Sequence, residues 1–384
     1  MIVRRIAIAG GKLQGIEAAY LAGLAGWESV LIDKKKNPPA AGLCSSFYNL
    51  DIIRDSFYLD RILRGVELII PAVEDITVLN ALYRLSQEVK TPLAYDVKAY
   101  YISRSKKLSS HLFKKSGILQ PEGWTDCGLP VIAKPSVSSG SRGVLKISNK
   151  NKLDAFIKQA GRGLKGWILQ KYIEGPSYSI EVLGLNGNYT AIQVTELGMD
   201  SHYDCNRVLA PADIPESLDK QIKEIAINIA CRLDLKGIMD VEFILDKEVL
   251  KILEIDARLP SQTPAAVYKS TGINMLELIA DIFIKGNLPK FPEIKILSGV
   301  VYEHIKVCQN KIEFPGEHVL GQAESLKTVS GFFGADEAIT NFNASSFSWV
   351  ATLISTGKTR QQALLKSQKV IENIRSYIEK PYRF

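Results

Sequence analysis

Residues 237–258, GIMDVEFILDKEVLKILEIDAR, decide the fold of this 384-residue chain. Two runs of alternating apolar and charged residues flank a short polar stretch, which is typical of a β-hairpin. Neighbouring side chains of a strand point to opposite faces. The odd-numbered apolar positions are expected in the core: Val241, Phe243, Leu245, Leu253 and Ile255. The even-numbered positions carry the charges: Asp240, Glu242, Glu254, Asp256 and Arg258.

The charged face of this hairpin predicts a cation site. If the turn centres on Glu248, then Glu242 lies opposite Glu254, and Asp240 lies opposite Asp256. Like charges directly opposite each other are unfavourable, so four carboxylates with one arginine on their face need a cation. Hard oxygen ligands beside phosphate oxygens suit Mg²⁺. An acidic surface balanced by nearby lysines is the alternative interpretation.

A second motif precedes the hairpin at residues 134–144, KPSVSSGSRGV. A lysine ends a strand, and a loop of small residues leads into the next strand. Small residues leave backbone N–H groups free to surround phosphate oxygens, and the lysine adds a fixed positive charge. The loop lacks the G-K-[ST] helix start of a Walker A motif, and an ordinary hairpin is the alternative interpretation.

The first hundred residues alternate strands and helices. Strands are expected near 6–9, 29–33 and 66–71, with helices near 16–25 and 76–89, which predicts a parallel sheet. The first turn, GGKLQG at 10–15, has Lys12 where a dinucleotide fingerprint needs its second glycine. Asp33 does end the second strand, where a ribose-binding acid would lie. A nicotinamide-dependent oxidoreductase is therefore kept only as an alternative of another class.

From about residue 130 the strands come in neighbouring pairs, as in antiparallel sheet. The pairs are 131–134 with 144–147, 179–185 with 189–195, and 239–245 with 249–255. Helices are expected at about 151–160, 216–232 and 275–285. The tail should contain strands near 299–307 and 348–355 and a final amphipathic helix that includes 364–378.

Composition narrows the function classes. Forty-eight basic and 41 acidic residues give a net charge of +7, and no arginine-rich stripe or reader motif predicts nucleic-acid binding. No apolar run approaches the ~20 residues of a membrane-spanning helix, and the N-terminus has no signal-peptide core. The five cysteines are odd in number and lack metal-ligand spacing, which favours a reducing cytoplasm over a disulfide framework or zinc site.

Taken in order, these motifs resemble the ATP-grasp superfamily of carboxylate–amine ligases. The resemblance rests on Lys106 before a helix, the Lys134 loop, the Gln-Lys-Tyr-Ile stretch at 170–173, and the final Glu-x-Asp-x-Arg. It covers about residues 1–290 and implies an α/β and α+β fold. We expect a Rossmann-like domain at 1–97, a two-lobed ATP-grasp domain at 98–292 with lobes split near 168–175, and a small C-terminal α+β domain at 293–384.

The resemblance also implies roles for single residues. ATP contacts are expected at Lys106, Lys134, Ser138, Ser139, Gly140, Ser141, Gly143, Gln170, Lys171, Tyr172, Ile173 and Glu181. The ligands of Mg²⁺, with two ions expected, are Glu242, Glu254 and Asp256. Arg258 and Lys134 are the catalytic candidates, because both would stabilise charge on the transferred phosphoryl group. Ser177 stands near the position where many relatives have a ribose-binding glutamate, so Glu174 or Glu181 would have to replace it.

Three further stretches are similar to one family within this superfamily. They are GGKLQGIEAAYL at 10–21, Tyr-Asp-Cys at 203–205 and LPSQTP at 259–264. They resemble the pyrrolysine-biosynthesis ligases, which join 3-methyl-D-ornithine to the ε-amine of L-lysine. Substrate contacts are then expected at Lys12, Gln14, Glu74, Tyr203, Asp204, Arg258, Ser261 and Thr263. A homodimer is a further expectation of the resemblance.

The implied chemistry needs no nucleophile on the enzyme. ATP converts a carboxylate into an acyl phosphate, and an amine then displaces the phosphate. A lysine ε-amine, with pKa ~10.4, must lose a proton for this attack, and Asp204 and Glu74 are candidate acceptors. Another ATP-grasp amino-acid or dipeptide ligase, or a noncatalytic ATP-binding regulator, are the remaining alternatives.

Overall fold

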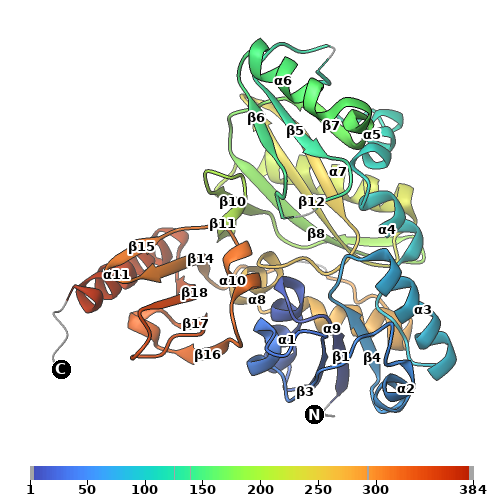
Figure 1. Cartoon of the computed structure of the whole chain (residues 1–384), viewed down its shortest axis with the longest axis vertical. Helices are drawn as coiled ribbons and strands as arrows, with labels where there is room; N and C mark the ends of the chain where they lie inside the picture. Colours follow the sequence, from blue (N-terminus) through green and yellow to red (C-terminus); the bar gives the residue numbers. More distant parts are fainter. Residues whose placement is uncertain (1–3, 125, 139, 292–293, 380–384) are drawn as a thin grey trace.

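A computed structural model describes residues 4–379 except 125, 139 and 292–293 (Figure 1). Its first unit is a four-stranded parallel sheet in the order β3-β2-β1-β4. The strands are β1 (Arg5–Ala9), β2 (Glu28–Ile32), β3 (Ser46–Tyr48) and β4 (Leu68–Pro71). The helices around it are α1 (Leu13–Leu24), η1 (Pro39–Leu43), α2 (Ser56–Arg64) and α3 (Ile76–Val89). Strands β1, β2 and β4 are almost wholly buried and apolar, as expected of a parallel sheet.

The second unit is a small antiparallel sheet with the order β6-β5-β7, at the top of Figure 1. Its strands are β5 (Val131–Pro135), β6 (Leu145–Ile147) and β7 (Trp167–Lys171). The helices of this region are α4 (Val97–Ser103), α5 (Lys106–Lys115), α6 (Lys150–Ala160) and η2 (Gly161–Gly166). Strand β6 is paired with β5 as the sequence predicts, whereas β7, which overlaps the expected lobe boundary near 168–175, is not predicted as a strand.

The third unit is an eleven-stranded sheet with the main order β13-β12-β8-β10-β11-β14-β18-β17-β16. Its central strands are β8 (Ser177–Leu185), β9 (Asn188–Ala191), β10 (Thr195–Met199), β11 (Cys205–Ala210), β12 (Gly237–Asp246) and β13 (Val249–Asp256). Its C-terminal strands are β14 (Gly299–Cys308), β15 (Lys311–Glu313), β16 (Lys327–Ser330), β17 (Glu337–Thr340) and β18 (Ser348–Gly357). The pairing of β11 with β14 joins the two groups in one continuous sheet.

Helices cover this large sheet. They are α7 (Glu216–Leu233), α8 (Thr263–Thr271), α9 (Met275–Ala280), η3 (Asp281–Lys285), α10 (His318–Gln322), η4 (Phe332–Gly334) and α11 (Arg360–Ile378). The expected mixture of α/β and α+β structure is confirmed. The division into three domains stays a prediction, and its second boundary falls on residues 292–293, outside the described residues. No described helix is long and apolar enough to cross a membrane.

One hydrophobic core joins the parallel sheet to the large sheet. It includes Ile8 of β1, Leu21 of α1, Ala266 of α8 and Tyr302 of β14, all of them buried. Helix α1 starts immediately after β1 and contacts α8, α9 and α10. This packing holds the first turn of the chain against the segment that follows the acidic hairpin, and so it positions the site described next.

Candidate active site

A cleft of about 410 Å³ lies between the three units. Most of the residues that the sequence singles out line this cleft. They come from the β6-β5-β7 sheet, from the large sheet and from the first turn of the chain. The predicted residues that line it are Lys12, Gln14, Glu74, Lys106, Lys134, Ser138, Gly140, Ser141, Gln170, Lys171, Tyr172, Ile173, Tyr203, Asp204, Glu242, Glu254, Asp256, Arg258, Ser261 and Thr263. Gly143 and Glu181 do not line the cleft, and Ser139 lies outside the described residues.

The acidic hairpin has the predicted pairing at its charged end. Glu242 lies opposite Glu254, and Asp240 lies opposite Asp256. The turn itself is tighter than expected, because Asp246 pairs with Val249, so only residues 247 and 248 form it. That turn alone would place Glu242 opposite Leu253. A register shift after Glu242, which pairs Phe243 with Ile252, restores the carboxylate pair.

The same shift corrects one predicted core position. Leu253 is half-buried and lines the cleft, so its assignment to the core was wrong. Leu250 and Ile252 are buried in its place. A bulge reverses the inward and outward alternation on one side of itself, and no local residue pattern marked it in this hairpin.

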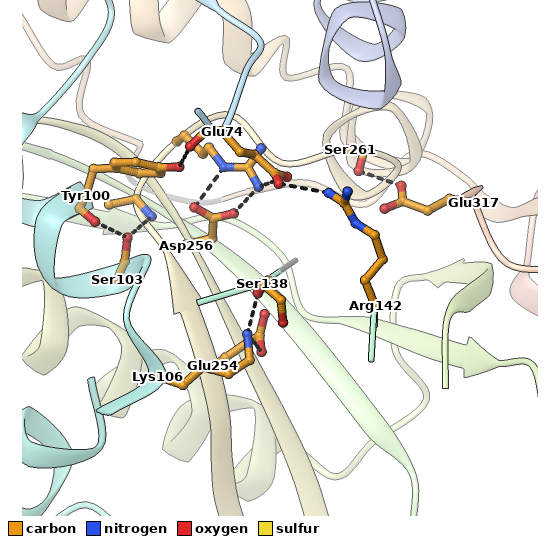
Figure 2. Close-up of polar contacts among 12 residues, drawn as sticks. Glu74, Tyr100, Ser103, Lys106, Ser138, Arg142, Glu254, Asp256, Ser261 and Glu317 are labelled. Carbon is orange, nitrogen blue, oxygen red and sulfur yellow. Dashed lines mark hydrogen bonds and ion pairs between the residues drawn. The ribbon is translucent and has the colours of Figure 1, made fainter. Parts of the chain in front are cut away.

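Two lysines face the carboxylate pair. The Lys106 ammonium lies 2.9 Å from the Glu254 carboxylate and donates a hydrogen bond to the Ser138 carbonyl at 2.8 Å (Figure 2). Burial lowers the pKa of Lys106, but Glu254 and Glu242 raise it more, so the net shift is upward. Lys134 is 7% exposed, and burial lowers its pKa despite the attraction of Glu254. Lys134 is therefore a buried cation that another negative charge would stabilise.

The remaining carboxylates of the hairpin are under electrostatic strain. Burial, followed by repulsion from Glu254, raises the pKa of Glu242 well above its ordinary value. Burial and the charge of Glu181 do the same to the pKa of Asp240, which accepts a hydrogen bond from the Ser179 hydroxyl. A divalent cation between Glu242 and Glu254 would remove the repulsion between them.

Oxygen donors of this kind fit Mg²⁺. In the described part of the chain, no three His, Cys, Asp or Glu side chains converge as a complete metal cage. Mg²⁺ usually takes only one or two carboxylates and completes its shell with phosphate oxygens and water. The pair Glu242 and Glu254 matches that pattern. Asp256 is held by Arg258 at 2.6 Å, and its role as a third ligand stays a prediction.

Arg258 connects the hairpin to the N-terminal unit. Its guanidinium donates to Asp256 through Nε at 3.0 Å and to Glu74 through Nη2 at 2.9 Å. Burial raises the pKa of Asp256 to about 6, although the charge of Arg258 lowers it. Glu74 precedes α3 and also pairs with Arg142 of the Gly/Ser loop at 3.3 Å (Figure 2). Sequence reasoning missed Arg142, although a single arginine in a loop of small residues indicates a possible contact with an anionic group.

The Gly/Ser loop adopts left-handed backbone at three described positions. Gly140 has φ 56°, Ser141 has φ 51° and Gly143 has φ 81°. A Cβ on Gly143 would lie 3.0 Å from the Pro135 ring, so this glycine shapes the loop rather than the cleft wall. The Ser141 hydroxyl donates to the Tyr203 carbonyl at 2.5 Å, which ties the loop to the segment between β10 and β11.

Glu181 lies beneath the cleft. It is fully buried in β8, opposite Asp240 of β12, and burial raises its pKa to about 7. A carboxylate in that position does not reach a ribose in the cleft, so the expected contact is not supported by the geometry. Ser177 does line the cleft, whereas Glu174 is exposed outside it. Ser177 and Glu181 lie on the same face of β8, so strand alternation does not separate them; Glu181 lies next to Thr263 of α8, which packs on this strand.

Two buried glutamates near the cleft escaped sequence reasoning. Glu17 of α1 is 1% exposed and accepts hydrogen bonds from the backbone N–H groups of Gln262 and Ala265, at 3.1 and 2.6 Å. It thereby holds the loop after Arg258. Glu317 accepts a hydrogen bond from the Ser261 hydroxyl at 2.6 Å, and burial raises its pKa to about 7 (Figure 2). A lone acid in the apolar sequence of α1 is the signal that could have indicated Glu17.

The buried Glu17 makes stability depend on pH. Burial raises its pKa from 4.5 to about 8, so the folded state keeps a proton that the unfolded state releases between those values. The contribution of this group to stability therefore falls as pH rises through that window. Glu17→Gln cannot ionise, so we expect its free energy of unfolding to rise relative to that of the wild type by up to about 1.4 kcal/mol per pH unit in this window. Urea unfolding at pH 5, 6.5 and 8 measures this difference, and a pH-independent difference would contradict the assignment.

Comparison with known proteins agrees with this geometry. A family model for the ATP-grasp domain matches residues 102–262. The 3-methyl-D-ornithine–L-lysine ligase of Methanosarcina acetivorans is 34% identical over 365 residues, which cover 94% of this chain and 95% of that protein. The ligase of the same name from Methanosarcina mazei is 33% identical, with coverage of 97% and 96%.

A solved structure shows the same fold. The biotin carboxylase domain of Hydrogenobacter thermophilus 2-oxoglutarate carboxylase, crystallised with MgADP and bicarbonate, matches with a TM-score of 0.75 and 15% identity. The match covers 97% of this chain and 90% of that domain. Fold and cleft together define an ATP-grasp protein. Within that superfamily, the chain belongs to the family of 3-methyl-D-ornithine–L-lysine ligases, and both resemblances drawn from the motifs are confirmed.

Proposed function

We propose that this protein uses ATP to join the carboxylate of 3-methyl-D-ornithine to the ε-amine of L-lysine, giving 3-methylornithyl-N6-lysine, ADP and phosphate. The observation that carries the proposal is the convergence of Lys106, Lys134, Arg258 and the Glu242–Glu254 pair in one cleft. Cations and carboxylates in this combination suit phosphoryl transfer, which depends on positioning and charge stabilisation. Membership of the ligase family supports the choice of substrates.

Different parts of the cleft would bind the adenine, the phosphates and the metal. Residues Gln170–Ile173, at the end of β7 and just after it, would hold the adenine end. The Gly/Ser loop with Lys106 and Lys134 would hold the phosphates. Mg²⁺ would be bound by Glu242 and Glu254, where it would neutralise charge on the transferred phosphoryl group. Arg258, next to Asp256, would stabilise the acyl phosphate. We propose that two Mg²⁺ ions bind, and a metal titration of the nucleotide complex counts them.

The substrate end of the cleft is acidic. Glu74, Asp204 and Glu317 all line it, and they suit the amino groups of two cationic amino acids. Arg258 lies between these acids and the hairpin, so it can meet the carboxylate that is to be activated. Lys12, Gln14, Tyr203, Ser261 and Thr263 complete the proposed wall. The five free cysteines suit a reducing compartment, and we propose the cytoplasm. A homodimer stays a prediction.

The test is phosphate release from Mg-ATP with D-ornithine, with and without L-lysine, and mass spectrometry of the product. D-Ornithine is a simpler stand-in for the methylated substrate. We expect release to depend on both amino acids and the product mass to equal their sum minus water. Release with other amino-acid pairs only would overturn the substrate assignment, and no release with any pair would favour a noncatalytic role.

Lys134 provides a separate test of the phosphate site. Lys134→Ala is expected to raise KM for ATP and to lower kcat together, because the buried ammonium would contact phosphate in both the ground state and the transition state. Initial rates over a range of ATP concentrations measure both constants. Lys158→Ala, on the polar face of α6, is the matched control and should leave both unchanged. Unchanged kinetics for Lys134→Ala would refute the phosphate role.

A further inference from the structure

A histidine and an aspartate form a pair at the substrate end of the cleft. His318 Nδ1 lies 2.5 Å from Asp204 Oδ2, and the His318 backbone N–H donates to the same oxygen at 3.1 Å. Asp204 is 4% exposed, whereas the His318 side chain is 46% exposed and lines the cleft. Since the carboxylate accepts a hydrogen bond from Nδ1–H, the lone pair of a neutral ring is on Nε2.

The surrounding chain holds this pair in place. Asp200 accepts hydrogen bonds from the backbone N–H groups of Asp204 and Gly316, both at 3.0 Å. A Cβ on Gly316 would lie 2.2 Å from the Asp204 Oδ2 atom, so a glycine is required where the backbone passes over this carboxylate. Asp204 lies between β10 and β11, and His318 begins α10, 114 residues later. The two segments therefore pack around this hydrogen-bonded pair.

Titratable groups of both signs lie near this pair. Glu317 precedes His318 and is bonded to Ser261, close to the loop that carries Arg258. His304 of β14 faces Gln262 and Thr352, and burial lowers its pKa to about 3, so it is neutral. Helix α1 contributes the buried Glu17, and its cap residue Lys12 lines the same cleft. η1 and β18, which also contact α10, carry no charged residue.

We propose that His318 is the general base that deprotonates the ε-ammonium of the attacking lysine, with Asp204 as its positioning residue. The inference rests on the proposed ligase function and assigns a residue to its second step. Glu317 and Asp204 supply the negative charge that would draw the ammonium group to this end of the cleft. Asp204 is buried and its Oδ2 accepts hydrogen bonds from the His318 ring and backbone, so it acts through His318 rather than as the base.

The ammonium first gives one proton to Nε2, and the electron pair of that N–H bond becomes the nitrogen lone pair. This lone pair forms the bond to the carbonyl carbon of the acyl phosphate, and the C=O π electrons move to oxygen. Bond formation makes the remaining N–H protons more acidic. The tetrahedral centre then breaks its C–O bond, and the leaving phosphate takes the second proton from nitrogen. Asp204 stabilises the imidazolium, which later releases its proton to water.

Hydroxylamine makes it possible to measure formation of the acyl phosphate separately from attack by the lysine amine. It is neutral and nucleophilic near pH 7, so it should trap the acyl phosphate as a hydroxamate without a base. We expect His318→Gln to keep the rate of D-ornithine hydroxamate formation and to lose lysine-dependent amide formation by about 10²-fold or more, the usual contribution of a general base. The amide deficit should shrink above pH 9, where lysine loses its proton unaided.

Two more variants make the result decisive. Asp204→Asn should show the same split between hydroxamate and amide, because it holds the ring in the wrong tautomer. His202→Gln is the matched control, since His202 lies in the same segment near Asp200 but its side chain is 83% exposed. Equal loss of both reactions in His318→Gln and Asp204→Asn, or loss of neither, would overturn the proposal. If the wild type forms no hydroxamate and shows no D-ornithine-dependent phosphate release, the ligase function itself fails.

Discussion

Glu254→Gln is expected to abolish ATP turnover while leaving the fold intact. Its carboxylate lies opposite Glu242 and 2.9 Å from Lys106. Glu254 would therefore bind Mg²⁺ beside a lysine that holds the ATP phosphates. Lys106 and Lys134 hold the pKa of Glu254 low against the effect of burial, which keeps it ionised. The glutamine side chain has the same shape as the glutamate side chain but carries no charge. We expect kcat to fall by about 10²–10³-fold or more, as for other groups that stabilise transition-state charge.

Phosphate release at saturating Mg-ATP measures this loss, and a thermal melt checks the fold. Glu248→Gln is the matched control, because Glu248 lies in the turn of the same hairpin and is exposed. Its activity should equal that of the wild type. Full activity of Glu254→Gln would show that the hairpin holds no metal. Raising Mg²⁺ should restore part of the rate if the variant binds the ion weakly.

Arg258 is the second position at which a large effect is expected. The guanidinium is 8% exposed and bridges Asp256 of the hairpin to Glu74 of the N-terminal unit. Arg258→Ala leaves both carboxylates without this partner, and we expect it to cost about 1–3 kcal/mol of unfolding free energy. The rate should fall by about 10²-fold or more, because the charge on the acyl phosphate also loses its partner.

Arg258→Lys separates the two effects. An ammonium keeps the charge but cannot bond both carboxylates in the forked geometry of arginine. We expect it to recover more of the stability than of the rate, as measured by urea unfolding and by product formation. Arg64→Ala, which breaks an exposed ion pair with Asp60, is the control and should change neither. An active Arg258→Ala variant would exclude Arg258 from the chemistry.

The residue pattern was sufficient for the local structure. Helix α3 spans the predicted residues 76–89, and the three predicted strand pairs occur in order. The predicted strand 189–195 is broken, since β9 ends at Ala191 and β10 begins at Thr195. Short-range periodicity reports which face of an element is buried, but it does not report which element covers that face.

The metal and phosphate groups were also accessible to sequence reasoning. Lys106, Lys134 and the Glu242–Glu254 pair each sit in a short motif whose charge pattern has a chemical meaning. The carboxylate pair follows from the hairpin, whereas its contact with the lysines is long-range, since the Lys134 ammonium donates to the Leu253 carbonyl across 119 residues. Glu181 shows the limit, because its burial beneath α8 depends on how a distant helix packs on β8.

Charge alternation in residues 237–258, the Lys-Pro loop and the alternating N-terminal elements are local patterns, and each had an alternative interpretation by itself. Their order along the chain, through its resemblance to the ATP-grasp superfamily, was enough to predict the fold and the phosphate end of the cleft. The contacts at the substrate end of the cleft could be identified only from the tertiary structure. Glu17 meets Gln262 across 245 residues, and Asp204 meets His318 across 114. Such contacts form because the shared core packs α1, α8 and the C-terminal strands together, and no short-range pattern encodes which distant side chains that packing brings face to face.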